Sequence, residues 1–275
     1  MTNKFLETYN FTRQFLRKFP YYLTGVFPFI YNFKNRNCYE NLSYNQLLRK
    51  KKSDVVFICG TGNSINNIKK KTWRIMEKYD IISFRDFPRK EGVKVDYHIS
   101  GEIDNSKNYA QIINKNLNYK YTYLIIQDGF RAIKGNTLIG KKLLNLNFKI
   151  FRYKRKNIDK MMNFSKKFNE GIVHSFNSLI SVINIAFIMG WKKIILVGID
   201  MDTHKYFYHK SNKVRDVEKK GITPTSSYTN RDKTLLLISL WNKRFQKKGI
   251  SLFIYNKNSY LKKTLPLFNW SILPK

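Results

Sequence analysis

The sequence predicts an α/β domain with a doubly wound, mostly parallel sheet. Short apolar runs rich in β-branched residues alternate with segments of helical period, which is the pattern of a parallel sheet covered by helices on both faces. Two of these runs end in glycine-containing turns, at Gly60 and Gly198. The chain has 275 residues, of which 43% are hydrophobic and 16% aromatic, so it can bury a substantial core.

The expected strands are spaced along most of the chain. The first, at 54–59, precedes the turn at Gly60, and a Lys-rich helical segment follows it. The last, at 251–255, follows a helix predicted over 234–248, which Gly249 should cap. Between them we expect strands at 80–84, 95–100, 121–126, 148–152 and 192–198, and a nearly all-apolar helix at 177–189 that ends at Gly190.

A polar run at 47–53 divides the chain into a basic, aromatic N-terminal extension, residues 1–52, and a main domain, residues 53–275. Within the main domain, residues 203–231 are polar and have no clear period, which predicts a lid. No run of 18 apolar residues occurs, so no transmembrane helix is predicted. The aromatic run at 21–31 lies between basic residues. It fits either contact with the headgroups of an anionic membrane or a helical hairpin packed on the main domain.

The charge of the chain predicts a polyanionic partner. Lys and Arg number 52 against 18 Asp and Glu, a formal net charge of +34. The basic residues are spread along the chain, and no nucleic-acid-binding motif occurs, which favours a membrane surface over nucleic acid. The two cysteines, Cys38 and Cys59, form neither a disulfide framework nor a metal cluster. They indicate a reducing, cytoplasmic compartment. Together with the basic charge, this predicts a protein that is peripheral to the inner face of the cell membrane.

Two strand ends are candidates for a ligand site. The turn Gly60-Thr61-Gly62-Asn63-Ser64 lets the backbone approach a phosphate or nucleotide, and Ser64 could cap the following helix; a plain tight turn is the alternative. Asp200 follows a central strand, and ligands of open α/β sheets bind beyond the carboxyl ends of strands. This carboxylate could accept a hydrogen bond from a ribose or sugar hydroxyl, or simply cap the next turn.

The predicted lid contains a candidate catalytic cluster. Histidine acts as a general base near neutral pH, and tyrosine hydroxyls can donate to a departing phosphate, although aromatic packing of a loop gives the same pattern. His98 alternates within a strand, so we expect a core histidine there, and His174 has a poorer setting for catalysis. The cluster consists of His204, Tyr206, Tyr208 and His209.

These motifs, in this order, resemble bacterial sialyltransferases of glycosyltransferase family 42 and their relatives over about residues 54–262. The opening Gly-x-Gly-x-Ser turn of that family matches the turn at 60–64. Its polar position after the second strand matches Arg85 and Asp86. The other matches are Asn177-Ser178 at the start of the apolar helix, Gly190-Trp191-Lys192, Gly198-Ile199-Asp200, and Asn258-Ser259 after the last strand.

The resemblance implies a GT-A-like nucleotide-binding domain and an inverting transferase that needs no metal or other cofactor. Its donor would be a CMP-activated sialic-acid-like sugar (nonulosonic or Kdo-type). Its acceptor would be a lipid-linked or cell-surface glycan of lipopolysaccharide or capsule, and self-association is common among relatives. The residues that the resemblance assigns to nucleotide binding are Gly60, Gly62, Asn63, Ser64, Arg85, Asn177, Ser178, Gly198, Asp200, Asn258 and Ser259, and those assigned to catalysis are His204, Tyr206, Tyr208 and His209.

The chain departs from the family at the histidine that follows the lid. The corresponding position falls near residues 227–229, which are Ser, Tyr and Thr. His204, His209 or a carboxylate such as Asp202 could substitute, or catalysis has been lost or changed. Two other functions stay open. One is a motility accessory or pterin pyrophosphokinase-like enzyme that needs ATP and a divalent metal; the other is a basic nucleic-acid-binding protein with steep salt dependence.

Overall fold

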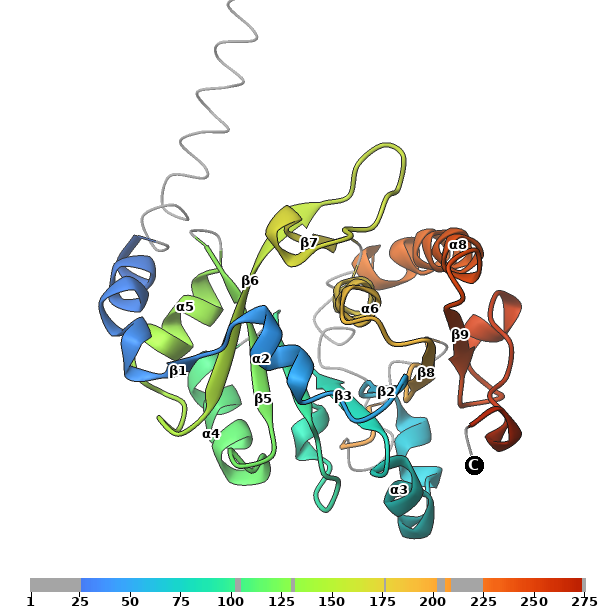
Figure 1. Ribbon diagram of the computed structural model, residues 1–275, viewed down its shortest axis with the longest axis horizontal. Coiled ribbons are helices and arrows are strands. Elements are labelled where there is room, and N and C mark those ends of the chain that lie inside the picture. Colours follow the sequence, from blue (N-terminus) through green and yellow to red (C-terminus); the bar gives the residue numbers. More distant parts are fainter. Residues whose placement is uncertain are drawn as a thin grey trace, which may run out of the picture.

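The computed structural model describes residues 26–101, 105–129, 132–175, 177–201, 206–208 and 225–273, with the backbone alone for 225–230. These residues form a nine-stranded sheet with helices on both faces (Figure 1). The strand order is β1-β6-β5-β4-β3-β2-β8-β9, with β7 beside β6, and every pairing between these strands is parallel. The predicted doubly wound α/β class is therefore confirmed.

The strands of this sheet are β1 (Glu40–Asn41), β2 (Val55–Cys59), β3 (Asp80–Phe84), β4 (Tyr97–Ser100), β5 (Tyr123–Asp128), β6 (Lys149–Asn157), β7 (Ile172–His174), β8 (Lys193–Val197) and β9 (Ser251–Ile254). The α-helices are α2 (Tyr44–Arg49), α3 (Lys70–Met76), α4 (Ser106–Asn116), α5 (Ile133–Gly140), α6 (Ser178–Ile188) and α8 (Thr225–Gln246), and a further helix spans residues 26–35. Short 3-10 helices are η1 (Arg36–Cys38), η2 (Asn63–Asn67), η3 (Phe87–Arg89), η4 (Phe168–Glu170), η5 (Tyr260–Lys263) and η6 (Trp270–Ile272).

Most of the predicted elements lie where the sequence placed them. Gly190 and Gly249 follow α6 and α8 with φ of 78° and 69°, as glycine caps do. The Lys-rich helical segment expected after the Gly60 turn is present as α3, and a 3-10 helix, η2, lies between it and the turn. One prediction needs correction: α8 begins at Thr225 instead of 234, inside the predicted lid at 203–231. Apart from α8, the structure describes only residues 206–208 of that lid.

The core forms two layers, one on each face of the sheet, because side chains alternate along every strand. On β2, Val56 and Ile58 face the layer that contains residues of α2, α6 and α8. Val55, Phe57 and Cys59 face the other layer, which contains residues of α3, α4 and α5. All five β2 side chains are buried, so β2 is a central strand whose carboxyl end has a fixed position.

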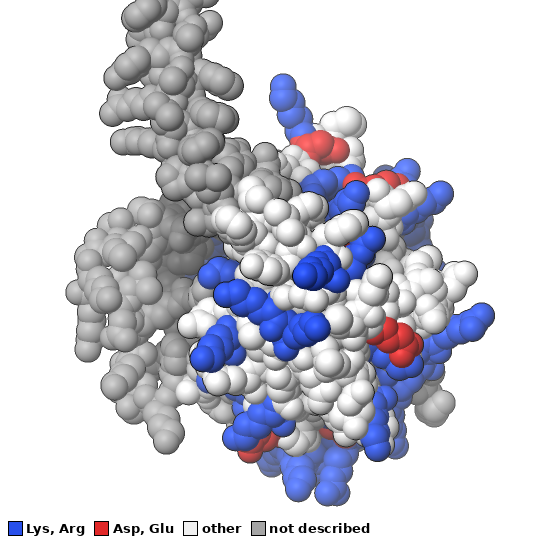
Figure 2. All heavy atoms as spheres, turned by 90° about the vertical axis from the view of Figure 1, so that its left-hand side faces the viewer, with Lys and Arg blue, Asp and Glu red and all other residues white. Residues whose placement is uncertain are grey.

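The described part of the N-terminal extension packs on the main sheet. The helix at 26–35 lies beside α5 (Figure 1), and Asn32 on this helix is buried. Its amide nitrogen donates to Asn136 Oδ1 at 2.7 Å, and its oxygen accepts from Arg152 Nη1 at 2.9 Å. This contact fixes which face of the helix turns to solvent. Lys and Arg side chains are spread over this side of the molecule, with few Asp or Glu between them (Figure 2).

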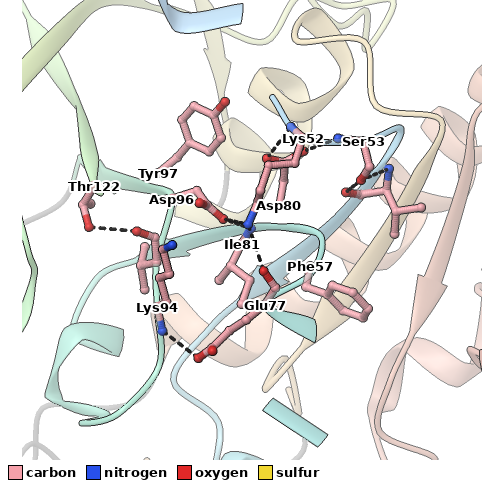
Figure 3. A network of polar contacts seen from close by, with 12 residues as sticks. Lys52, Ser53, Phe57, Glu77, Asp80, Ile81, Lys94, Asp96, Tyr97 and Thr122 are labelled. Carbon is pink, nitrogen blue, oxygen red and sulfur yellow. Dashed lines mark hydrogen bonds and ion pairs between the residues drawn. The ribbon is translucent and has the colours of Figure 1, made fainter. Parts of the chain in front are cut away.

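Buried carboxylates join the strands at the amino edge of the sheet (Figure 3). Asp80 accepts hydrogen bonds from the backbone N–H of Lys52 and Ser53 and from Trp191 Nε1 at 2.9 Å. Burial raises the pKa of Asp80 above its ordinary value. Asp96 accepts from Ile81 N at 2.9 Å and pairs with Lys52 Nζ at 2.7 Å. These contacts hold β2, β3, β4 and β8 together at the edge opposite the candidate site.

The candidate site lies at the carboxyl edge, at the point where the strand order reverses. From β2 the chain proceeds through β3, β4, β5 and β6 on one side, and β8 and β9 lie on the other side of β2. In open α/β sheets the crevice between two such neighbouring strands is the usual ligand site. Here the crevice is bounded by the residues after Cys59 and after Val197.

Candidate functional site

The turn after β2 runs in close contact with the end of β8. Gly60 N donates to Val197 O and Gly62 N to Gly198 O, both at 2.8 Å. A Cβ atom on Gly62 would lie 2.5 Å from Asp200 Oδ2 and 2.8 Å from Gly198 O. Only glycine permits so close an approach, so the turn is built to fit against the neighbouring strand end.

The carboxylate of Asp200 joins three strand ends at this edge. Asp200 is 7% exposed. Its oxygens accept from Ser64 N at 2.9 Å, from Ser64 Oγ at 2.5 Å and from Asn256 Nδ2 at 2.9 Å. Its backbone oxygen also accepts from Tyr260 N at 2.8 Å. We call Asp200, Ser64 and Asn256 the aspartate junction, because these residues follow β8, β2 and β9.

The aspartate junction changes two expectations. Ser64 does not cap the helix that follows the turn: it lies inside η2, whose N-cap position is Gly62, and its side chain bonds Asp200 instead. Asp200 has both oxygens engaged within the protein, so a ribose or sugar hydroxyl would add to these bonds or replace one of them. Asn63, beside Ser64, has an exposed side chain whose oxygen accepts from Asn66 Nδ2 at 3.3 Å.

The Asn258-Ser259 pair lies next to the aspartate junction. Ser259 is buried, donates from Oγ to Ile199 O at 2.6 Å and accepts from Leu261 N at 3.2 Å. Its hydroxyl therefore holds the end of β8 and the start of η5. Asn258 has an exposed side chain, and its backbone N–H donates to Asn256 Oδ1 at 3.0 Å. Both residues support the junction through these contacts.

A second group of predicted residues surrounds a small cavity between β3 and the start of α6. Arg85 follows β3 with a φ of 54°, a conformation that non-glycine residues seldom adopt. The N-terminus of α6, an 11-residue helix, favours anions near Ser178. The cavity holds about 10 Å³, roughly one water molecule. It is lined by Phe84, Arg85, Ile99, Gly101, Tyr153, His174, Ser178 and Ser181.

Asn177 immediately precedes α6 and contains an unsatisfied acceptor. Its amide nitrogen donates to Thr234 Oγ1 at 2.9 Å. Its amide oxygen is buried and has no hydrogen-bond partner within the described residues. Buried polar atoms are seldom left without a partner, so a ligand donor would stabilise this position.

His174 lines the same cavity, although from the sequence we expected it to have a poor setting for catalysis. Its Nδ1 lies 3.0 Å from Ser181 Oγ, and that hydroxyl donates its single proton to Val173 O at 3.1 Å. The ring therefore donates from Nδ1 to this hydroxyl, which fixes the orientation of the imidazole beside the cavity. Its strand, β7, has only three residues and gives no sequence pattern by which to find it.

His98 is the core histidine that the sequence predicted. It is buried, with Nδ1 2.7 Å from Ser83 Oγ and Nε2 2.5 Å from Tyr109 OH. Burial lowers the pKa of His98 to about 3. A histidine that stays neutral across the physiological range, with both nitrogens engaged, is part of the core.

Two of the four predicted lid residues lie within the described chain, and they lie beside the Gly60 turn. Tyr206 pairs with Gly62 in an isolated β-bridge, and the rings of Tyr206 and Tyr208 stack with centroids 5.4 Å apart. Tyr208 OH donates to Asp86 Oδ2 at 3.4 Å, and burial raises the pKa of Tyr208, so its hydroxyl keeps its proton. The other two, His204 and His209, lie outside the described residues, as does Asp202.

Within the described ranges, no three His, Cys, Asp or Glu side chains are grouped to hold a metal ion. The donors that the described chain brings to this edge are a guanidinium group, tyrosine and serine hydroxyls, amides and the end of α6. Such groups bind and stabilise a phosphate.

No family model and no curated protein matches this chain. Among solved structures, it is similar to the sialyltransferase CstII of Campylobacter jejuni in complex with the substrate analogue CMP-3FNeuAc, with 14% identity, a TM-score of 0.44, and 77% of this chain and 85% of that chain covered. It is also similar to the monofunctional α-2,3-sialyltransferase Cst-I of Campylobacter jejuni, with 15% identity, a TM-score of 0.45, and 82% of each chain covered. At these values, a function for this chain has to be argued from its own residues.

We predict that Asp200→Ala lowers the free energy of unfolding by about 2–4 kcal/mol, because Ser64 N and Asn256 lose their acceptor. Urea unfolding measures this change. The matched control is Asp54→Ala, which removes an exposed carboxylate paired with Lys51 and should change the stability by at most about 0.5 kcal/mol. Equal stability of Asp200→Ala and the wild type would contradict the structural role of the junction.

Proposed function

We propose that this chain is an inverting glycosyltransferase that moves a sialic-acid-like sugar from a CMP donor to a glycan or lipid-linked acceptor without a metal cofactor. One observation carries the proposal: the Gly60–Ser64 turn meets Asp200 at the point where the strand order reverses. Ligands of doubly wound folds bind at such points. The residues that meet there are the ones whose motifs resemble family 42.

The phosphate of CMP would bind near Arg85. A guanidinium group and a helix N-terminus are strong ligands for a phosphate, and Arg85 lines one cavity with Ser178 at the start of α6. The stacked hydroxyl-bearing rings of Tyr206 and Tyr208 lie beside the Gly60 turn. Phenolic hydroxyls would donate to the negative charge that grows on the departing phosphate, and Tyr208 would exchange its hydrogen bond to Asp86 for one to the phosphate. The cavity is too small for a phosphate as it stands, so binding would displace side chains that line it.

The transfer needs a base for one proton. An acceptor hydroxyl oxygen bonds the anomeric carbon, the bond from that carbon to the CMP phosphate oxygen breaks, and CMP leaves with the electron pair. The hydroxyl proton then passes to the base. The candidates are His204 and His209 from the sequence, and His174 from the cavity at Arg85.

We predict that replacing the base with glutamine lowers kcat for transfer from a CMP-sugar by about 10²–10⁴-fold. His174→Gln and the double variant His204→Gln/His209→Gln separate the candidates. The control is Lys70→Gln on the exposed side of α3, which should leave kcat unchanged. His98 is buried in the core, so His98→Gln would test stability instead of catalysis. If all these variants turn over like the wild type, the proton acceptor is not a histidine.

We predict that CMP binds selectively and that Arg85→Ala weakens its binding by at least about tenfold, since charge-assisted hydrogen bonds contribute about 1.5–3 kcal/mol each. Titration calorimetry with CMP, UMP, GDP and ATP measures both effects. The control Arg74→Ala removes an exposed arginine from α3 and should leave CMP binding unchanged. Tight binding of ATP with divalent metal, and none of CMP, would instead favour the pyrophosphokinase-like alternative.

We also propose that the protein lies on the inner, cytoplasmic face of the cell membrane, held by the helix at 26–35. None of the helices in the described part of the chain is both long and apolar enough to cross a bilayer. Phe27, Ile30 and Phe33 are 66%, 54% and 63% exposed, on the sides of the helix turned away from buried Asn32. Arg36 lies over the ring of Phe33 at 4.4 Å, and the surrounding surface is rich in Lys and Arg (Figure 2). Exposed aromatic rings flanked by cations suit an anionic lipid surface.

We predict that the triple variant Phe27→Ser/Ile30→Ser/Phe33→Ser binds vesicles containing phosphatidylglycerol at least about tenfold more weakly than the wild type, because apolar side chains no longer enter the interface. Vesicle co-sedimentation of the full chain measures this. Leu236→Ser, on the exposed side of α8, is the matched control and should bind like the wild type. Undiminished vesicle binding by the triple variant would favour helix packing alone as the role of these residues.

A further inference from the structure

A groove at the carboxyl end of β9 lies beside the proposed donor site and shares Ser64 with it. It measures about 300 Å³ and opens to solvent beside the aspartate junction. Ser64 and Asn256 line it, and the same two side chains bind Asp200. The other residues that line it are Asn67, Ile68, Tyr255, Lys257, Leu267, Phe268 and Trp270.

One wall of the groove is aromatic and held in place. The ring of Trp270 packs edge-on against Phe268 with centroids 5.0 Å apart and against Tyr255 at 6.3 Å. The side chain of Asn269 accepts from Ser271 N at 3.1 Å and fixes the start of η6, where Trp270 lies. Trp270 is 37% exposed, whereas the other three tryptophans of the chain, Trp73, Trp191 and Trp241, are buried. Part of this aromatic wall is therefore open to a ligand.

The remaining lining is polar and carries positive charge. Neither Lys257 Nζ nor the side-chain amide of Asn67 has a hydrogen bond or an ion pair within the described residues. The amide of Asn256 donates one hydrogen to Asp200 and accepts from Asn258 N, which leaves its second N–H for a ligand. Among the described residues that line the groove there is no carboxylate. The groove thus combines an aromatic surface, two amides and one uncompensated cation.

We infer that this groove binds an anionic sugar unit of a glycan. The C–H face of a pyranose ring packs against an aromatic side chain, and side-chain amides donate to and accept from its hydroxyls. The ammonium group of Lys257 would pair with a carboxylate or phosphate on the sugar. A nucleotide phosphate is better served at Arg85 and the α6 N-terminus, because the groove offers a single ammonium group and no guanidinium.

The groove's place in the molecule fits the acceptor side of a transfer reaction. It adjoins the aspartate junction, so a glycan lying in it would extend toward the crevice between β2 and β8. This assignment to the acceptor rests on the proposed function, whereas glycan binding itself can be measured without any donor. Glycan binding in the groove and the acceptor role of that glycan can therefore be refuted independently.

The test is binding of the full-length protein to an array of acidic and neutral oligosaccharides, without CMP. We expect the wild type to bind acidic members, Trp270→Ala to lose at least about tenfold in affinity, and Lys257→Ala to lose its preference for acidic over neutral members. Trp270→Phe keeps an aromatic ring and should retain most of the affinity. Thermal unfolding of each variant verifies that the fold is intact.

Matched controls come from the opposite edge of the sheet, where Lys94 Nζ lies 4.3 Å over the exposed ring of Tyr121. Lys94→Ala and Tyr121→Ala should bind the acidic oligosaccharides like the wild type. This result distinguishes binding in the groove from general attraction to a basic surface. Quenching of Trp270 fluorescence by the best array ligand should disappear in Trp270→Phe. The inference is overturned if no oligosaccharide binds or if Trp270→Ala binds like the wild type. It is also overturned if Lys94→Ala and Tyr121→Ala lose as much affinity as Trp270→Ala, or if CMP displaces the oligosaccharide.

Discussion

One buried carboxylate determines the geometry of the functional edge. Asp200 binds Ser64 through both backbone and hydroxyl, and it also binds Asn256, so the segments that leave β2, β8 and β9 are fixed against one another. This contact requires glycine at position 62, because any Cβ there would occupy the space of the carboxylate. A buried anion is stable only with such hydrogen bonds, and the same bonds hold the crevice and the neighbouring groove in a defined relation.

The two edges of the sheet have different roles: the amino edge holds the strands together, and the carboxyl edge contains the candidate site. At the amino edge, Asp80 and Asp96 join four strands through backbone N–H groups, the Trp191 indole and Lys52. At the carboxyl edge, polar groups surround a small cavity on one side of the aspartate junction and a groove on the other. Arg85, with its left-handed backbone, belongs to this second edge. Strained conformations are retained where the surrounding structure holds them, and they are common at functional sites.

Periodicity was sufficient to predict the fold class and most of the sheet. Buried strands such as β2 and β8 are continuous apolar runs, and α6 is apolar at most of its positions, so each of them is visible in the sequence alone. The strands that were missed, β1 and β7, have two and three residues, too few to show alternation. The helical segment predicted after Gly60 is present as α3, but Ser64 does not cap a helix, because Asp200, 136 residues away, binds the serine hydroxyl that local rules assign to a cap.

The candidate site was predictable only where it depends on strand ends. Gly60, Gly62, Gly198 and Asp200 meet as expected because β2 and β8 are neighbours. His174 and Trp270 could not be found in the same way, since their positions depend on packing between distant segments.

The network at the amino edge also bears on how such a chain can change over time. Because Asp80, Asp96 and Trp191 hold the sheet together far from the crevice, residues of the opposite rim outside the aspartate junction contribute less to the stability of the scaffold. Substitutions there can change the lining of the crevice and of the groove while the protein remains folded. A scaffold anchored at one end in this way tolerates variation at the other end.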